Sequence, residues 1–372
     1  MDTLITGAAS PPFIPGLALS ERFFRTAVEP LLATHFPALR YAAARLDRGS
    51  DVMGFDTPQS RDHDWGPKTT VFLSDDDLKR HGDAIVAMLG NELPFTIDGY
   101  ATHFDRPTVD GGLLTHTTQR PIAHGVDPTT MARFTREYLG VDATQAIDER
   151  AWLAIPSQRL CTIRRGRVFR DDIGLTAVRE RLHWYPRDVW YYRLANQWRR
   201  IDQEEPWVGR CGDVGDELGS RIVTTRLVIE LMRLCFLIEG EYWPYFKWFG
   251  TAFSRLHCGG TLAPIFDDAM SAADWKTREA ALGRAYVYIG EMQNSLGLTT
   301  PVEPRLAPFF GRPYLVPHAM RFAEALYAVI ESAAVRALPP FVGAVDQFAD
   351  STDILDDLPK AQALLAVYNV AP

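Results

Sequence analysis

The sequence has few cysteines and no long uninterrupted apolar run. Only four cysteines occur in 372 residues, and no two of them form a CxxC pair, which argues against a zinc knuckle or a disulfide framework. The longest apolar stretch, residues 227–238, contains Glu230 and Arg233, which a bilayer would penalise. We therefore expect neither a metal site built on thiolates nor a membrane span.

The chain also lacks the positive charge that binds nucleic acid. Its formal net charge is −8 at pH 7, so it would repel a polyanion. The N-terminal stretch has an acidic second residue, no basic region and several prolines, unlike a signal peptide. We expect a cytoplasmic protein whose partners are small molecules, with no nucleic acid and no membrane among them, and we leave its oligomeric state open.

What is present is a globular composition, with 47% hydrophobic residues and 23% charged residues. Helical spacing predicts a helix over residues 19–35, capped by Ser20, and a second helix that begins after Ser74. Strands are expected between and after these helices: 39–46, 61–65, 71–73, 95–104 and 113–126, the last two joined by a turn at Gly111-Gly112.

The pattern changes to a helical period from Leu175 onward. Four helices are expected there: 187–205, 220–239, 275–294 and 317–338. The sequence therefore predicts the α+β class, with a mixed sheet and helices in residues 1–160 and a mainly α-helical region in residues 161–372.

Two aspartates carry the clearest chemistry. Asp62 and Asp64 are two residues apart, so on a strand they would present adjacent carboxylates on one face. Two like charges held this close repel each other unless a cation relieves them, and Mg²⁺ bridging carboxylates and triphosphate oxygens is a common solution. We predict that Asp62 and Asp64 are the metal ligands, with Mg²⁺ as the cofactor.

Gly49 and Ser50 follow the first expected strand directly. A glycine there lets the backbone approach a phosphate, and the exposed amides and the serine hydroxyl can donate hydrogen bonds to it. Asp51 comes next and would bring a negative charge near the phosphates unless it points away. We predict that Gly49 and Ser50 bind the triphosphate.

The order strand, Gly-Ser, about a dozen residues and Asp-x-Asp resembles the signature of the nucleotidyltransferase superfamily, which includes aminoglycoside nucleotidyltransferases and polymerase beta-like enzymes. Segments around residues 209–220, 244–253 and 345–353 resemble a bacterial branch of that superfamily described as a domain of unknown function. The resemblance implies an N-terminal nucleotidyltransferase-fold domain followed by helices. One departure is Arg61, which separates Ser60 from the first aspartate, where the superfamily usually has the serine directly before it.

A third carboxylate usually completes such a site, as a metal ligand or as the base for the attacking hydroxyl. Our candidate is Asp127, which we place at the end of a strand, before Pro128 and a helix that opens near Thr129. Asp98 is the alternative, although Asp-Gly is more typical of a turn. By resemblance to the aminoglycoside enzymes, Lys247 would bind the triphosphate from the helical region, or it is a surface lysine that packs over aromatic residues.

We therefore expect a Mg²⁺-dependent enzyme that transfers a nucleoside monophosphate from a nucleoside triphosphate, ATP by expectation, to a hydroxyl of a small molecule and releases pyrophosphate. Catalysis would consist chiefly of positioning and charge neutralisation by Asp62, Asp64 and Asp127. The alternative is a protein of the same fold that binds the triphosphate without turnover. The sequence identifies neither the acceptor nor the preferred base.

Overall fold

The computed structural model describes residues 11–61, 65–105 and 112–369. The chain divides into two compact units. The first, called the sheet unit, comprises Met1–Ala146 and Arg159–His183, and the second, called the helical unit, comprises Ile147–Gln158 and Trp184–Pro372. In the part of the chain described, no helix is long and apolar enough to cross a membrane.

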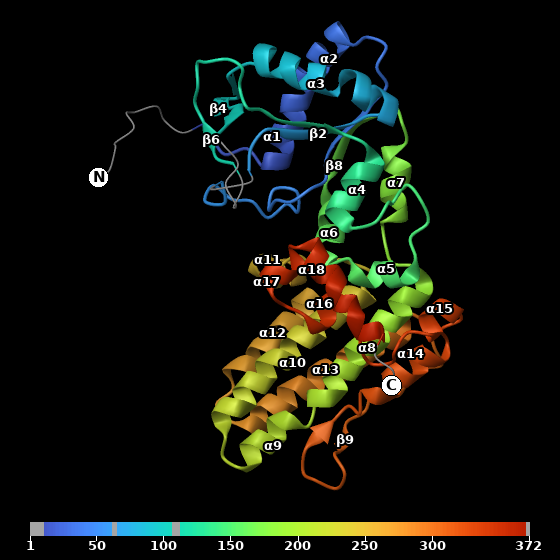
Figure 1. Ribbon diagram of the computed structural model, residues 1–372. Helices are drawn as coiled ribbons and strands as arrows, with labels where there is room; N and C mark the ends of the chain where they lie inside the picture. Colours follow the sequence, from blue (N-terminus) through green and yellow to red (C-terminus); the bar gives the residue numbers. More distant parts are fainter. Residues whose placement is uncertain (1–10, 62–64, 106–111, 370–372) are drawn as a thin grey trace. The chain divides into compact units, whose positions relative to one another are not determined.

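A four-stranded mixed sheet forms the centre of the sheet unit (Figure 1). Its order is β7-β2-β1-β8, with β1 antiparallel to both of its neighbours and β7 parallel to β2. The strands are β1 (Ala42–Arg45), β2 (Lys68–Phe72), β7 (Gly125–Thr129) and β8 (Arg167–Asp171). The mixed pairing confirms the predicted α+β class.

One face of this sheet carries the main apolar core of the unit. The elements that cover it are α1 (Gly16–Phe23), the π-helical segment η1 (Phe24–Val28), α2 (Glu29–His35) and α3 (Asp75–Glu92). Phe24 of η1 stacks on Phe169 of β8 with 5.7 Å between ring centroids, and Leu89 of α3 packs in the same cluster. Ser74 caps α3 as predicted, since its hydroxyl accepts a hydrogen bond from the Asp77 amide at 3.1 Å.

Ser20 does not cap the first helix, because that helix begins at Gly16. The predicted cap is wrong, and Ser20 is instead buried within α1. Its hydroxyl donates to the Gly66 carbonyl at 3.2 Å and accepts from the Lys68 amide at 3.3 Å. Ser20 therefore attaches α1 to the beginning of β2.

The opposite face of the sheet packs against α4 (Met131–Leu139), α6 (Ser157–Arg165) and α7 (Leu175–Arg181). Phe72 of β2 meets Phe134 of α4 edge to face, with 5.3 Å between ring centroids. Both faces of β2 are therefore covered.

The second strand begins later than the sequence predicts. Arg61 and Trp65, the described ends of the strand expected over residues 61–65, lie outside any strand, and β2 starts at Lys68. Asp62, His63 and Asp64 lie outside the described residues.

Two short hairpins follow α3. They pair β3 (Thr96–Ile97) with β4 (Tyr100–Ala101), and β5 (His103–Phe104) with β6 (Leu114–Thr115). The predicted turn at Gly111-Gly112 falls between β5 and β6, and its Gly111 lies outside the described residues.

The helical unit is built around α8 (Arg187–Glu204), α10 (Glu217–Ile238), α13 (Trp275–Ser295) and α14 (Met320–Ala328) (Figure 1). Trp198 of α8 stacks on Phe322 of α14, with 4.3 Å between ring centroids. Three of the four predicted helices are confirmed. The fourth, expected over residues 317–338, is wrong as one helix because the chain breaks between α14 and α15 (Ala333–Arg336).

The unit contains further helices and a two-stranded sheet. They are α5 (Glu149–Ala154), α9 (Trp207–Asp213), α11 (Phe246–Phe253), α12 (Gly259–Ser271), β9 (Ala307–Pro308), β10 (Leu315–Val316), α16 (Val345–Phe348), α17 (Thr352–Leu355), α18 (Leu358–Ala363) and the 3₁₀ helix η2 (Leu364–Asn369). Helices therefore dominate the second part of the chain, as predicted.

Candidate functional site

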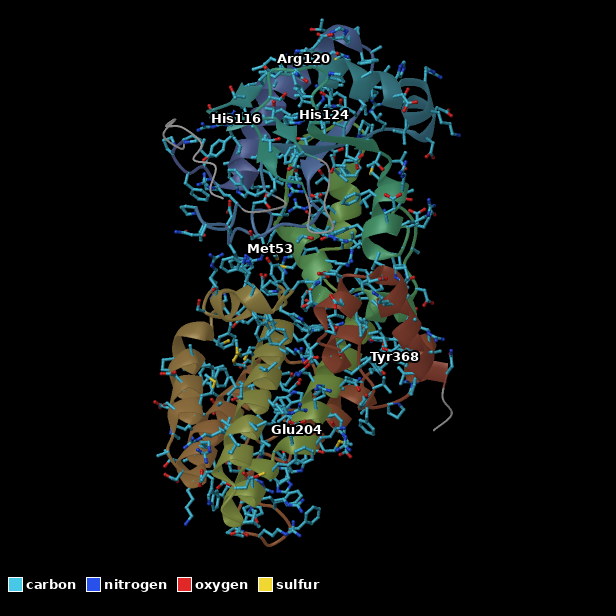
Figure 2. The ribbon with its side chains drawn as sticks, turned by 60° about the vertical axis from the view of Figure 1, so that its left-hand side comes forward. Met53, His116, Arg120, His124, Glu204 and Tyr368 are labelled. Atoms are coloured by element: carbon cyan, nitrogen blue, oxygen red, sulfur yellow. The ribbon has the colours of Figure 1, made fainter. Side chains whose placement is uncertain are left out.

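The antiparallel pairing of β1 with β2 determines where the candidate site begins. Ala44 pairs with Thr70, so the end of β1 and the beginning of β2 lie at the same end of the sheet, which is called the sheet edge below. Residues 46–67 connect the two strands at this edge and contain Gly49, Ser50, Asp62 and Asp64. Figure 2 labels Met53, a buried residue of this connection.

Gly49 has a backbone that only glycine adopts easily. Its φ is +141°, and a Cβ atom at this position would lie 2.0 Å from Asp51 Oδ1. Gly49 and Ser50 are both partly exposed. The Ser50 carbonyl accepts a hydrogen bond from the Phe55 amide at 2.9 Å, which closes the turn behind them. Both predicted phosphate-binding residues therefore lie on an accessible turn at the sheet edge.

Asp51 does not face the solvent side of this turn. Its side chain is 1% exposed, and its Oδ2 lies 3.5 Å from Nε of the equally buried Arg45. Burial raises the pKa of Asp51, while the charge of Arg45 opposes that rise. Arg45 also donates to the Arg48 carbonyl at 2.8 Å. The negative charge next to Gly-Ser is therefore directed inward and paired.

Asp56 ties the connection to two other segments. Its Oδ2 accepts hydrogen bonds from the Gly16 amide at 2.7 Å and from Nε1 of Trp65 at 3.0 Å. The Trp65 ring is buried between Phe13, at 6.4 Å, and Tyr100, at 5.1 Å between ring centroids. Trp65, the residue directly after the predicted metal ligands, is thus held by packing and by a hydrogen bond.

The residues directly before the aspartate pair are also held locally. The Ser60 hydroxyl donates to the Thr57 carbonyl at 3.1 Å and accepts from the Thr57 amide at 2.6 Å. Nε of Arg61 donates to the Pro58 carbonyl at 2.8 Å, and its guanidinium lies 5.7 Å from the Trp65 ring centroid. Ser60 is therefore used in a turn, while Arg61 contacts the residue on the other side of the pair.

Asp127 lies in the middle of a strand and not at its end, so this part of the prediction is wrong. β7 continues through Pro128 to Thr129, and Thr130 caps α4 by accepting from the Arg133 amide at 3.2 Å. Asp127 is an exposed residue of the edge strand β7 and pairs with Thr70 of β2. Partial desolvation raises the pKa of its carboxyl, and the charge of Arg133 opposes the shift. Whether Asp127 is the third carboxylate stays a prediction.

Asp98 occupies the turn between β3 and β4. Its φ is +48°, and its carboxylate forms an ion pair with Arg22 at 3.0 Å. The interpretation of Asp98 as a turn residue is confirmed by this backbone conformation.

Lys247 belongs to α11 in the helical unit and is exposed. Its Nζ lies 5.3 Å from the centroid of the Trp248 ring. This contact is what the surface-packing interpretation expects, and a role at the triphosphate stays a prediction.

Sequence reasoning did not identify Arg45 and Asp56 as parts of the site. For Arg45, the available sequence signal was a charged residue at the end of the apolar strand Ala42–Arg45. For Asp56 no local signal exists, because its partner Gly16 is 40 residues away in the chain.

No group of three or more His, Cys, Asp or Glu side chains that could hold a metal ion occurs among residues 11–61, 65–105 and 112–369. Asp62 and Asp64 lie outside these residues, so their role as Mg²⁺ ligands stays a prediction.

Comparisons with known proteins add a family match and a distant structural likeness. The family described as "Domain of unknown function (DUF4037)" matches residues 152–249. The crystal structure of a nucleotidyltransferase-like protein from Exiguobacterium sibiricum is similar at 10% sequence identity and a TM-score of 0.32, over 83% of this chain and 89% of that chain. No curated protein matches the chain. The family match includes Lys247 and lies outside residues 46–67, which carry the candidate site.

Proposed function

We propose that the protein is a Mg²⁺-dependent nucleotidyltransferase that transfers a nucleoside monophosphate from a nucleoside triphosphate to a hydroxyl of a small molecule. The observation that supports this most is the register of β1 and β2. Because the two strands are antiparallel, the Gly-Ser turn after β1 and the segment that leads into β2 meet at one sheet edge. Phosphate-binding groups and metal ligands need this proximity.

Each residue of the proposed site has a separate task. Gly49 and Ser50 bind the β- and γ-phosphates with backbone amides and the serine hydroxyl. Asp62 and Asp64 hold Mg²⁺, which when bound neutralises charge on the triphosphate. Asp127 orients or deprotonates the acceptor hydroxyl. The inward direction of Asp51 supports this arrangement, since its charge is paired with Arg45 and turned away from the accessible side of the turn.

The alternative is a protein that binds the triphosphate without turnover. This alternative is favoured by the position of Asp127. Asp127 is the third residue of β7 and pairs with Thr70, the third residue of β2, so it does not lie at the start of either strand. A catalytic base at this position would have to reach the acceptor hydroxyl from within the strand and not from its end.

Pyrophosphate release separates the two functions. The full-length protein is incubated with Mg²⁺, ATP or another nucleoside triphosphate and a set of small hydroxyl compounds, and pyrophosphate and labelled adducts are measured. Transfer that requires Mg²⁺ and disappears in Gly49→Ala supports the enzyme, because a Cβ at Gly49 would collide with Asp51. Mg²⁺-dependent binding without any pyrophosphate would support the binding protein, and absence of binding would contradict both.

A further inference from the structure

The helical unit contains a cavity of about 940 Å³ that the proposed nucleotide site does not use. Its walls come from the end of α8, the beginning of α9, the β9–β10 hairpin and the beginning of α14. Glu204, labelled in Figure 2, marks the end of α8. The volume is within the range of small-molecule sites, which is about 300–1,000 Å³.

The charged residues of the wall leave an excess of positive charge. Arg199 is paired with Asp202, Glu204 with Arg226, and Arg305 with Glu303. Arg210 and Arg321 also line the cavity, and neither has an ion-pair partner in the described part of the chain.

Arg321 is held in place by the backbone. Its Nη2 donates to the Pro317 carbonyl at 2.8 Å, so the position of its guanidinium is fixed before a ligand arrives. Glu205, the remaining carboxyl of the wall, has its pKa raised to about 8 chiefly by burial, so it is mostly neutral at pH 7. The wall therefore presents two guanidinium groups to an anion.

Aromatic side chains line the same cavity. Trp207 is 41% exposed and Phe310 is 85% exposed, an unusual accessibility for such large apolar groups. Phe309 lies beside Phe310, with 4.7 Å between ring centroids. An exposed pair of rings next to fixed guanidinium groups suits a ligand that has both a ring and a negative charge.

The backbone of Phe310 is strained. Phe310 and Gly311 have φ values of +48° and +75° in the turn of the β9–β10 hairpin, which the Arg312 amide closes on the Phe309 carbonyl at 3.0 Å. Asn, Asp and Gly are the residues that suit such a turn, and a bulky aromatic residue does not.

A second strained residue lines the cavity. Four described non-glycine residues have positive φ, and two of them, Phe310 and His318 at +51°, belong to this wall. Strained residues concentrate at ligand sites, where the surrounding structure holds them in an unfavourable conformation. The cavity, the charges, the exposed rings and the strain thus coincide in one place.

We propose that this cavity binds a small aromatic anion, with Arg210 and Arg321 contacting its phosphate or carboxylate group and Trp207 and Phe310 covering its ring. All the residues of this site belong to the helical unit. Its occupation requires no metal ion.

The test is calorimetric titration of the full-length protein, in the presence of EDTA, with 1-naphthyl phosphate, 1-naphthoate and the neutral 1-naphthol. At least one of the two anions should bind about tenfold or more tightly than 1-naphthol, and the stronger one identifies the acidic group. Equal affinity for all three compounds, or no binding of either anion at millimolar concentration, would overturn the proposal.

Two variants with matched controls locate the site. Arg210→Ala should weaken binding of the anion about tenfold, whereas Arg312→Ala, which removes the same charge from the hairpin turn outside the cavity wall, should not. Phe310→Gly should raise the melting temperature by a few degrees, because glycine adopts this positive φ without strain. The same variant should bind the aromatic anion more weakly, because it lacks the side chain that covers the ligand ring. Leu315→Ala, an exposed apolar residue of the same hairpin, should leave the affinity unchanged.

If Arg210→Ala and Arg312→Ala bind the anion equally well, the proposed charge contact is wrong. A Phe310→Gly protein that melts higher and binds with unchanged affinity would show that the exposed ring has no part in binding, and would overturn the assignment of the cavity.

Discussion

The carboxylate of Asp56 accepts a hydrogen bond from the indole Nε1 of Trp65 at 3.0 Å and a second one from the Gly16 amide at 2.7 Å. One side chain thus joins the connection after β1, the beginning of α1 and the residue that follows the Asp62–Asp64 pair. If those aspartates hold Mg²⁺, Asp56 acts on the site through Trp65 as a positioning residue and touches no phosphate itself.

Replacing Trp65 with Phe tests this positioning. The variant keeps a ring between Phe13 and Tyr100 but loses the indole donor, so we expect the free energy of unfolding to fall by about 1–3 kcal/mol. Binding of Mg²⁺-triphosphate should weaken at the same time. Chemical denaturation and calorimetry measure the two effects.

Trp190→Phe is the matched control for that experiment. Trp190 also uses its indole donor within the fold, to the Leu237 carbonyl at 2.8 Å, but in the helical unit. It should lose similar stability and keep its triphosphate affinity. Equal losses of affinity in both variants would mean that Trp65 acts only through general stability.

Much of the fold follows from local sequence signals. The helices α3, α8 and α13 were predictable from their apolar spacing, and Ser74 and Asp274 also cap α3 and α13. The strand β8 was not predictable. Only Phe169 is buried in Arg167–Asp171, and Arg170 forms an ion pair with Glu29, so an edge strand here has no apolar pattern.

The motif of the candidate site could be predicted from the sequence, but the contacts that hold this motif in place could not. Gly49 and Ser50 stand next to a strand in the sequence, and the structure has them on a turn at its end. Asp51 is a contrasting case, because its burial against Arg45 depends on the packing of the whole connection. The position of Asp127 was misjudged because Pro128 suggests the end of a strand, whereas an edge strand tolerates a proline.

Asp127 separates an enzyme from a binding protein. If it is the base, Asp127→Asn should leave triphosphate affinity within a few fold and lower kcat of transfer by roughly 10²–10⁴-fold. Asp98→Asn should be nearly silent in transfer, because Asp98 is a turn residue paired with Arg22. Single-turnover assays with labelled triphosphate compare the two. Loss of transfer in Asp98→Asn alone would exchange their roles.

The role of Lys247 can be tested against a second lysine that also lies over a tryptophan ring. Lys247→Ala should weaken triphosphate binding more than monophosphate binding if its charge contacts the γ-phosphate. Lys276, whose Nζ lies 5.6 Å from the Trp275 ring centroid, is the matched control, and Lys276→Ala should change neither affinity. Calorimetry with both nucleotides provides the comparison. Identical behaviour of the two variants would leave Lys247 as a surface-packing residue.

Glu205 should make stability depend on pH. Burial raises its pKa from 4.5 to about 8, against the opposing effect of hydrogen bonds from the backbone amides of Ala319 and His318. Asp202 adds to the rise and Arg321 opposes it, while the buried Tyr286 hydroxyl stays neutral because its pKa is raised too.

The native state therefore keeps a proton on Glu205 that the unfolded chain has lost. The resulting stability is fully present below about pH 4.5 and disappears as the pH rises through about 8. Compared with Glu205→Gln, the wild type should lose up to about 1.4 kcal/mol of unfolding free energy per pH unit within this window. Denaturant titrations from pH 4 to 9 test this, and parallel curves for the two proteins would contradict it.

The central claim is that Asp62 and Asp64 hold the Mg²⁺ of a bound nucleoside triphosphate, and calorimetric titration of Mg²⁺-ATP and other Mg²⁺-triphosphates into the single variants tests it most directly. We predict that the wild type binds, and that Asp62→Asn and Asp64→Asn each lose this binding while their melting temperatures remain close to that of the wild type. Asp76→Asn, an exposed carboxylate of α3 in the same unit, should bind like the wild type. Unchanged affinity in both Asp62→Asn and Asp64→Asn would contradict the account.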